Sequence, residues 1–202
     1  MNKPQIHISI EGFDGVGKTT TCQKLSQRLN FLFIEKPLKE FFESESAYLK
    51  LRDQVNSWPE RNFTATFYGM GSIYMYHKYA DKKIITDRHL CSNYAWSGTE
   101  DNTDIYELLL SKLGKPAITA VLYAEKETIK SRLQTRNTSD SDLIKIDKSE
   151  YIYNKMRLFC TNNQLNTVWI HTDNRTPDDI ANIIIQHLEE TQIIPKALFN
   201  EL

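Results

Sequence analysis

Long hydrophobic runs are absent from this sequence. No apolar stretch in its 202 residues approaches the roughly 20 residues that a membrane-spanning helix needs, so we predict no transmembrane helix and no membrane partner. The first five residues lead almost at once into a strand-like stretch, and we therefore expect no signal peptide. Apolar residues make up 40% of the chain, which is enough for a sizeable core.

Cysteine and net charge are also scarce. Cys22, Cys91 and Cys160 are far apart and lack metal-ligand spacing, so we expect reduced thiols in a cytoplasmic protein. The net charge of −1 gives no electrostatic reason to expect a nucleic-acid partner. Internal repeats, low-complexity tracts and a linker to a second domain are absent too, and we expect one domain over residues 1–202.

The most informative stretch runs from Ile8 to Thr20. An apolar strand leads into a glycine loop and a helix start, with the pattern G-x-x-x-x-G-K-T between Gly12 and Thr19. Glycines let main-chain N–H groups surround a phosphate, and the positive end of the helix dipole adds to this attraction. Lys18 would reach the outer phosphates of a nucleoside triphosphate, and the Thr19 hydroxyl would bind Mg²⁺. The predicted ATP-binding residues are Gly12, Asp14, Gly15, Val16, Gly17, Lys18, Thr19 and Thr20.

Short apolar segments alternate with segments of helical periodicity. The predicted strands are 5–10, 31–34, 83–87, 117–123 and 167–171. This alternation predicts an α/β fold with a parallel sheet covered on both faces, and a ligand at the carboxyl ends of the strands. The loops after the first three strands carry Asp14, Glu35, Asp87 and Arg88. We expect these four side chains to converge on one crevice.

The connecting segments are predicted mainly as helices. We expect seven helices. The first follows the glycine loop, the second covers much of 38–53, and the third begins at Arg61. The others begin with Thr103 as a cap, span 126–136, follow residue 147 and follow Thr176. The helix that begins at Arg61 carries one stripe of large apolar side chains, Phe63, Phe67, Met70 and Tyr74, while Gly69 and Gly71 weaken the middle of this helix. Residues 88–98 are predicted as a loop, with Ile105, Leu108 and Leu109 facing inward after it, and residues 137–147 as a mobile flap.

Phosphoryl transfer needs a metal and cations around the migrating group. Asp87 ends an apolar strand and can hold Mg²⁺, often through water, opposite Thr19. Cations could come from Lys18, Arg88 and a basic flap with Arg132, Arg136, Lys145 and Lys148. Arg132 and Arg136 are four residues apart and share a helix face, which could also be a solvated surface.

Several segments resemble those of thymidylate kinases, and two of them carry specific motifs. Glu11 to Thr20 is similar to their E-G-x-D-G-x-G-K-T-T loop, and Asp87 to Gly98 to their D-R-Y-x-x-S-x-x-A-Y-Q-G segment. The segment around Phe67 is similar to their L-F-x-x-x-R helix, and the segments 132–136 and 147–150 to their flap motifs. The resemblance implies a P-loop kinase three-layer sandwich with strand order 2-3-1-4-5, a short lid at about 137–149, and a homodimer.

The resemblance also implies an activity, the Mg²⁺-dependent transfer of the ATP γ-phosphate to a deoxynucleoside monophosphate, with dTMP as first candidate. Asp14 would approach the sugar 3′-hydroxyl, Arg88 would hold the acceptor phosphate, and Phe67 would stack on the base. The remaining implied acceptor-binding residues are Glu35, Ser92, Asn93 and Trp96. Some family members carry an arginine where Gly15 stands, so catalytic cations would here come from Arg132 and Arg136, beside Lys18.

Departures from the family pattern leave alternatives open. The thymine-reading arginine of the family falls at Gly71 and its glutamine at Ser97, so the base is not predicted. In a deoxynucleoside kinase, the second candidate, Glu35 would deprotonate a 5′-hydroxyl; in a monophosphate kinase it would position Mg²⁺, water or an arginine. A nucleotide-binding switch is a third candidate. An aromatic stripe such as the one with Phe67 more often belongs to the core than to a base platform, and Trp96 could cover the sheet edge.

Overall fold

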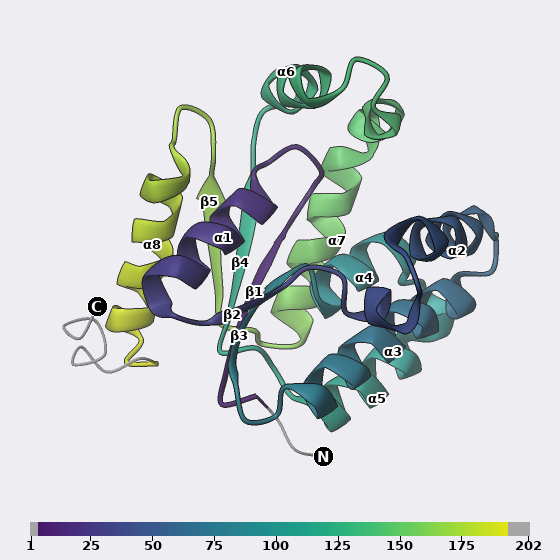
Figure 1. The fold of residues 1–202 in the computed structure, drawn as a ribbon, viewed down its shortest axis with the longest axis horizontal. Helices are drawn as coiled ribbons and strands as arrows, with labels where there is room; N and C mark the ends of the chain where they lie inside the picture. The colour runs from purple at the N-terminus through teal and green to yellow at the C-terminus, as the bar shows by residue number, and fades with distance from the viewer. Residues whose placement is uncertain (1–3, 194–202) are drawn as a thin grey trace.

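One parallel sheet organises the part of the chain, residues 4–193, that the computed structural model describes (Figure 1). Its five strands are β1 Ile6–Gly12, β2 Leu32–Ile34, β3 Lys83–Asp87, β4 Ile118–Tyr123 and β5 Thr167–His171. Their order, β2-β3-β1-β4-β5, confirms the predicted one. Central β1 pairs Ile10 with Asp87 of β3 and Gly12 with Leu122 of β4, so the carboxyl ends of three strands lie level.

Helices cover both faces of the sheet, which confirms the predicted three-layer sandwich (Figure 1). Contacts join α1 to α8 on one side, and join α3 to α4 and α5, and α4 to α7, on the other. The helices are α1 Lys18–Leu29, α2 Glu45–Ser57, α3 Arg61–Lys78, α4 Leu90–Ser97, α5 Thr103–Leu113, α6 Lys126–Arg136, α7 Ser149–Asn162 and α8 Pro177–Glu190. Between residues 4 and 193, no helix combines the length and apolarity that crossing a bilayer requires.

Residues 88–98 differ from their prediction, because α4 occupies most of the expected loop. Leu90, Cys91 and Ala95 are buried in the main core, and α4 packs against both α3 and α7. Two of the polar residues that suggested a loop are buried with protein partners and so do not need solvent: Asn93 donates to Ala65 O at 2.9 Å, and the Ser92 hydroxyl donates to Glu11. A helix of two turns is too short to be predicted from the periodicity of its apolar residues.

The segment predicted as helix over much of 38–53 is divided in two. A short 3₁₀ helix covers Pro37–Phe41, and α2 then begins at Glu45 and ends at Ser57. The Ser44 hydroxyl accepts a hydrogen bond from Ala47 N at 3.2 Å, which makes Ser44 the N-cap that sets the start of α2. The helix therefore extends to Ser57, beyond the predicted range.

The buried face of α3 is not the predicted aromatic stripe. Of its four members only Phe67 is buried, while Phe63 and Met70 are exposed. The buried face consists mainly of small residues that admit close neighbours. A Cβ on Gly69 would lie 2.7 Å from Leu109 Cδ1 of α5, so this glycine permits the helix contact rather than merely weakening the helix.

Several other elements follow their predictions closely, with local differences. The bounds of α6 and β5 are as predicted, and Thr176 caps α8 in a capping box with Asp179. Leu108 is exposed rather than inward, and Asn102 precedes α5 as its cap in place of Thr103. The expected flap contains a 3₁₀ helix at Ser141–Lys148. Of the C-terminal tail, residues 194–202 lie outside the described residues.

Candidate active site

The loop between β1 and α1 has the backbone that its glycines predict. Gly12, Gly15 and Gly17 have φ angles of 135°, 81° and 94°, a region that L side chains avoid. A Cβ on Gly12 would lie only 2.3 Å from Leu122 O of β4, so the loop leaves the sheet in direct contact with its neighbour strand. The loop then leads into α1, which begins at Lys18 and has no acidic residue in its first turn. This is a backbone suited to binding an anion.

Lys18 is buried at the centre of this loop. Its Nζ donates to Phe13 O at 2.6 Å and lies 3.8 Å from Asp14 Oδ1. Burial lowers the pKa of Lys18 below its usual value, and the charge of Arg88 adds to the effect. The carboxylates of Asp14 and Asp87 oppose it by favouring the ammonium form.

Thr19 and Asp87 meet where the sequence placed them. The Thr19 hydroxyl donates to Asp87 Oδ2 at 2.5 Å, because the pairing of β1 with β3 brings the end of β3 beside the start of α1. A hydroxyl and a carboxylate are hard oxygen donors of the kind that Mg²⁺ prefers, so the residues present fit this ion.

Asp14 and Arg88 form an ion pair beside the loop. Arg88 Nη2 donates to Asp14 Oδ1 at 2.7 Å, Nη1 donates to Gly12 O at 3.0 Å, and the Arg88 main-chain N–H donates to Ile10 O at 2.9 Å. Burial alone would raise the pKa of Asp14, but the charges of Arg88 and Lys18 hold that pKa well below its usual range. Arg88 also has a φ of 75°, and such strained residues cluster at functional sites.

Two of the residues implied as acceptor contacts are buried behind Arg88. The Ser92 hydroxyl lies 3.3 Å from Arg88 Nη1 and also donates to Glu11, while Asn93 bonds Ala65 and Tyr106. Their polar atoms therefore face protein partners, which favours a supporting role.

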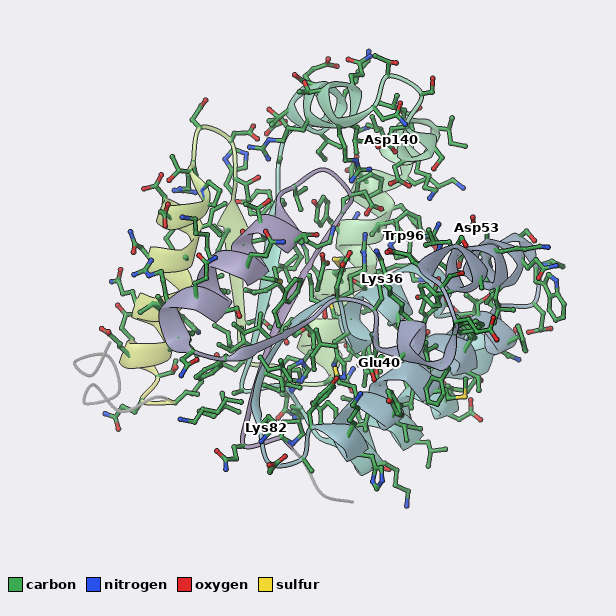
Figure 2. The ribbon with its side chains drawn as sticks, viewed as in Figure 1. Lys36, Glu40, Asp53, Lys82, Trp96 and Asp140 are labelled. Atoms are coloured by element: carbon green, nitrogen blue, oxygen red, sulfur yellow. The ribbon has the colours of Figure 1, made fainter. Side chains whose placement is uncertain are left out.

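Trp96, by contrast, is half-buried, with its ring 5.6 Å from that of Phe13 in the loop. Lys145 Nζ lies 5.9 Å from the centre of its ring. Figure 2 shows Trp96 drawn between Asp140 of the flap and Lys36 after β2. Trp96 thus contacts both the glycine loop, through Phe13, and the flap, through Lys145.

Phe67 and Glu35 have different surroundings. Phe67 is buried in a small second cluster with Leu38, Tyr48 and Val55 beneath α2, as the core alternative predicted. Glu35 follows β2, is 44% exposed and lies 2.9 Å from Lys36 Nζ. Its carboxylate is therefore accessible, whereas the Phe67 ring is largely covered.

The two flap arginines share a helix face but bind different segments. Arg132 donates to Thr172 Oγ1 at 2.9 Å and to Thr172 O at 2.8 Å, after β5. Arg136 donates to Asp140 Oδ2 at 2.8 Å from Nε and also contacts Asp142 at 3.2 Å. Lys145, which contacts Trp96, is a further flap cation whose charge contributes to the low pKa of Asp14.

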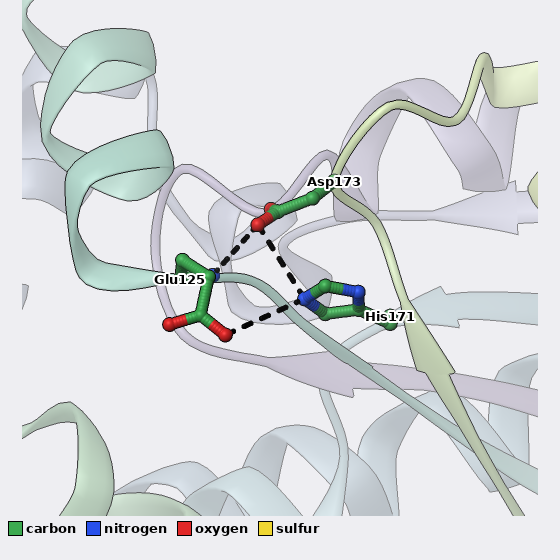
Figure 3. Close-up of side chains that lie close together, drawn as sticks. All are labelled: Glu125, His171 and Asp173. Atoms are coloured by element: carbon green, nitrogen blue, oxygen red, sulfur yellow. Dashed lines mark hydrogen bonds and ion pairs between the residues drawn. The ribbon is translucent and has the colours of Figure 1, made fainter.

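A separate group of titratable side chains lies at the ends of β4 and β5 (Figure 3). His171 Nε2 lies 3.4 Å from Asp173 Oδ2 and 3.8 Å from Glu125 Oε1, and Glu125 N donates to Asp173 Oδ2 at 3.3 Å. These contacts join the loop after β5 to the start of α6. Glu125 is 77% exposed, and surface ion pairs of this kind contribute little to stability.

Comparison with known families decides the assignment. The profile of the family described as thymidylate kinase matches residues 10–180, most of the chain. This chain belongs to the thymidylate kinase family. It is accordingly an ATP-dependent nucleotide kinase, as the loop and the D-R segment predicted. A search of the curated proteins finds no match.

Several solved structures, kinases among them, share the fold. Thymidylate kinase from Candida albicans superposes with a TM-score of 0.67 at 17% identity, over 94% of this chain and 93% of that one. Deoxyadenosine kinase from M. mycoides with bound dCTP has a TM-score of 0.60 at 20% identity, over 92% of this chain and 100% of that one. The YorR protein from Bacillus subtilis, in complex with phosphorylated GDP, gives 0.61 at 22% identity, over 94% and 99%.

This thymidylate kinase fold brings further residues to the site that the sequence did not assign. The Tyr153 hydroxyl of α7 accepts from Phe13 N at 3.4 Å and donates to Leu122 O at 3.1 Å, so it supports the loop from behind. Glu11 is completely buried next to Gly12. Helical periodicity predicted α7 but could not predict that Tyr153 would contact the glycine loop. Glu11 belongs to the family motif, but its position there suggested no role.

Proposed function

We propose that this kinase transfers the γ-phosphate of ATP to a deoxynucleoside monophosphate, with Mg²⁺. The observation that carries the proposal is the Arg88–Asp14 pair, 2.7 Å apart and in contact with the donor loop. A fixed arginine fork suits the acceptor phosphate, and a neighbouring carboxylate suits a sugar hydroxyl. A nucleotide-binding switch has no use for such a pair.

The donor side would use the remaining loop residues. The N–H groups from Gly12 to Thr20 would surround the ATP phosphates, and Lys18 would neutralise their developing charge. Thr19 and Asp87 would hold Mg²⁺, which when bound supplies charge stabilisation to the β- and γ-phosphates. Among the flap cations we propose Lys145 together with Arg132 and Arg136, because Lys145 contacts Trp96 beside the loop.

The base preference of the acceptor should be broad. Family membership makes dTMP the first acceptor to test, but position 71 holds a glycine whose Cβ would already lie 3.1 Å from Leu38 Cγ. An arginine does not fit there without moving Leu38. Ser97, at the position of the family's glutamine, is buried. With neither thymine-reading side chain present, we expect other deoxynucleoside monophosphates to be accepted as well.

Glu35 supports a second candidate, a deoxynucleoside kinase. Its carboxylate is accessible at the carboxyl end of β2, where it could take the proton of a nucleoside 5′-hydroxyl. An ionised phosphate acceptor needs no such base. Glu35→Gln should therefore leave monophosphate turnover largely intact and should abolish nucleoside turnover if the second candidate is right.

A coupled ADP-release assay over deoxynucleosides and their monophosphates separates the candidates. We expect ADP release to depend on a monophosphate. Turnover with nucleosides but with no monophosphate would establish the second candidate instead. ATP hydrolysis that no added nucleotide changes would identify a switch protein.

Lys18→Ala provides the test of the donor loop, with Lys24→Ala as matched control. Both lysines lie on α1, but the side chain of Lys24 is 39% exposed and pairs with Asp178 at 3.2 Å, away from the glycine loop. We expect Lys18→Ala to lower the transfer rate by several orders of magnitude and Lys24→Ala to leave it unchanged. Near-normal transfer by Lys18→Ala would contradict the assigned loop.

We further propose a homodimer formed through the outer face of α3 and α5. Large apolar side chains are exposed there: Phe63 42%, Met70 53%, Ile73 37% and Leu108 59%. In α3 these residues recur at helical spacing along one exposed stripe, as an interface requires. Met70→Asp should yield a monomer by light scattering, whereas Leu158→Asp, at a 49% exposed site on α7, should not.

A further inference from the structure

Glu11 is completely buried, and its carboxylate binds residues outside the donor loop that follows it. It lies at the carboxyl end of β1, directly before Gly12. Its Oε1 accepts a hydrogen bond from the Ser9 hydroxyl, and its Oε2 accepts one from the Ser92 hydroxyl and one from Ser92 N, at 3.1 Å. All three partners are donors, which is what an acceptor-only carboxylate requires. A buried charge satisfied in this way is costly to disturb.

Glu11 caps α4 from another element of the fold. Ser92 is the third residue of α4, and its N–H is one of the four that an α-helix leaves without an internal partner. The residue before the helix, His89, makes no side-chain cap. The negative charge of Glu11 therefore lies at the positive end of α4, where it is favourable.

The same contacts lead to Arg88. The Ser92 hydroxyl has one proton, and it donates that proton to Glu11. Its lone pairs are then available to Arg88 Nη1, 3.3 Å away, on the guanidinium that binds Asp14. The charge on Glu11 thus fixes the direction of the hydrogen bonds from Arg88 to Ser92 to Glu11. An amide at position 11 could donate to Ser92 and remove this direction.

We propose that Glu11 is the positioning residue for Arg88. Its carboxylate orients the Ser92 hydroxyl and the first turn of α4, and so holds the guanidinium in the orientation that receives the acceptor phosphate. The inference rests on the proposed function, in which Arg88 binds that phosphate. Glu11 itself touches neither nucleotide in this scheme, and its effect is specific to the acceptor side.

Glu11→Gln tests the role of charge with little change of shape. We expect the KM for the monophosphate to rise about 10- to 100-fold, the range expected when a hydrogen bond to a charged group is lost, with the KM for ATP within about threefold. The matched control is Ser9→Ala, because Ser9 donates only to Oε1 of Glu11, so its loss leaves the charge and both Ser92 contacts at Oε2, which lead to Arg88, in place. It should leave both KM values within about threefold. Equal increases in the two KM values would overturn the proposal.

A double-mutant cycle with Arg88→Ala separates positioning from general damage. If Glu11 acts through Arg88, adding Glu11→Gln to Arg88→Ala should raise the acceptor KM by less than about twofold further. Multiplicative effects would overturn the proposal. Should Glu11→Gln not fold, Ser92→Ala replaces it in the same cycle with the same expected result.

The free energy of unfolding of the same four proteins gives a cycle that needs no substrate. Non-additive changes in the free energy of unfolding would show that positions 11 and 88 are coupled. If the wild type nevertheless turned over no monophosphate, the proposed function would be wrong while the link between Glu11 and Arg88 would stand. Additive effects in urea unfolding would overturn the link between Glu11 and Arg88 whatever the substrate is.

Discussion

Replacing Gly12 by alanine should destabilise the protein through two separable effects. The first is backbone strain, because Gly12 has a φ of 135°, and positive φ costs an L residue about 1–2 kcal/mol. The second is a clash, because the new Cβ would lie 2.3 Å from Leu122 O, a main-chain atom near the carboxyl end of the neighbouring strand β4. Overpacking of this kind costs roughly 1–3 kcal/mol, so the expected loss of unfolding free energy is about 2–5 kcal/mol.

Gly17→Ala isolates the strain from the clash. Gly17 has a φ of 94°, but a Cβ there would meet no atom within 4 Å. We expect a loss of only about 1–2 kcal/mol, and the difference between the two variants then measures the contact with β4. Urea unfolding followed by far-UV circular dichroism gives both values, provided that the slope m is unchanged.

Equal losses in the two variants would refute this reasoning, since they would mean that the start of the loop moves away from Leu122 at no cost. A Gly12→Ala protein as stable as the wild type would contradict the strain argument as well. If Gly17→Ala were the less stable protein, the open space around its Cβ would have been misjudged.

Three other changes test other parts of the molecule. Thr176→Ala removes the side-chain half of the capping box of α8 and should cost about 1 kcal/mol in urea unfolding. Leu133→Ala removes a fully buried side chain that packs beneath Gly15 and should cost about 2–5 kcal/mol, with the midpoint of urea unfolding as readout. Burial, with His89 adding to it, lowers the pKa of His7 well below its usual value, so on acidification the unfolded chain binds the proton first. Stability should be full above about pH 6.5 and should fall below it, and His7→Gln should weaken this dependence in urea titrations at pH 7.5 and 5; an unchanged dependence would exclude His7 as its source.

The sequence predicted those elements whose signal is local. The strands and the helices α6, α7 and α8 have clear periodicity or strong caps, and their bounds lie close to the prediction. The prediction of the buried face of α3 was wrong, because close packing between helices selects small residues and a pattern of hydrophobic residues does not reveal them. The burial of Gly69 against Leu109 depends on α5, which lies some 40 residues along the chain. Likewise, the sequence predicted reduced thiols but could not predict that Cys91 and Cys160, 69 residues apart, lie 3.6 Å from each other between their Sγ atoms where α4 packs on α7.

The candidate site follows the same distinction. The meeting of Thr19 with Asp87 could be predicted because parallel strands end at one edge of the sheet, so residues after two adjacent strands must be near one another. The partners of Arg132 and Arg136 could not, because a spacing of four residues places side chains on one helix face without saying which segment lies opposite. In this fold the segments opposite are the loop after β5 for one arginine and the flap for the other.

The carboxyl end of β1 links the donor and acceptor sides of the candidate site. Gly12 opens the phosphate loop, yet its carbonyl, together with that of Ile10, also accepts hydrogen bonds from Arg88. Glu11, between them, reaches the same arginine through Ser92. Because successive residues of a strand point to opposite faces, one short segment can use its main chain and its side chain for different neighbours. The geometry of Arg88, for which we propose binding of the acceptor phosphate, is therefore set by the strand that carries the glycine loop, which gives a physical reason for the glutamate, the glycine and the aspartate to occur together in one motif.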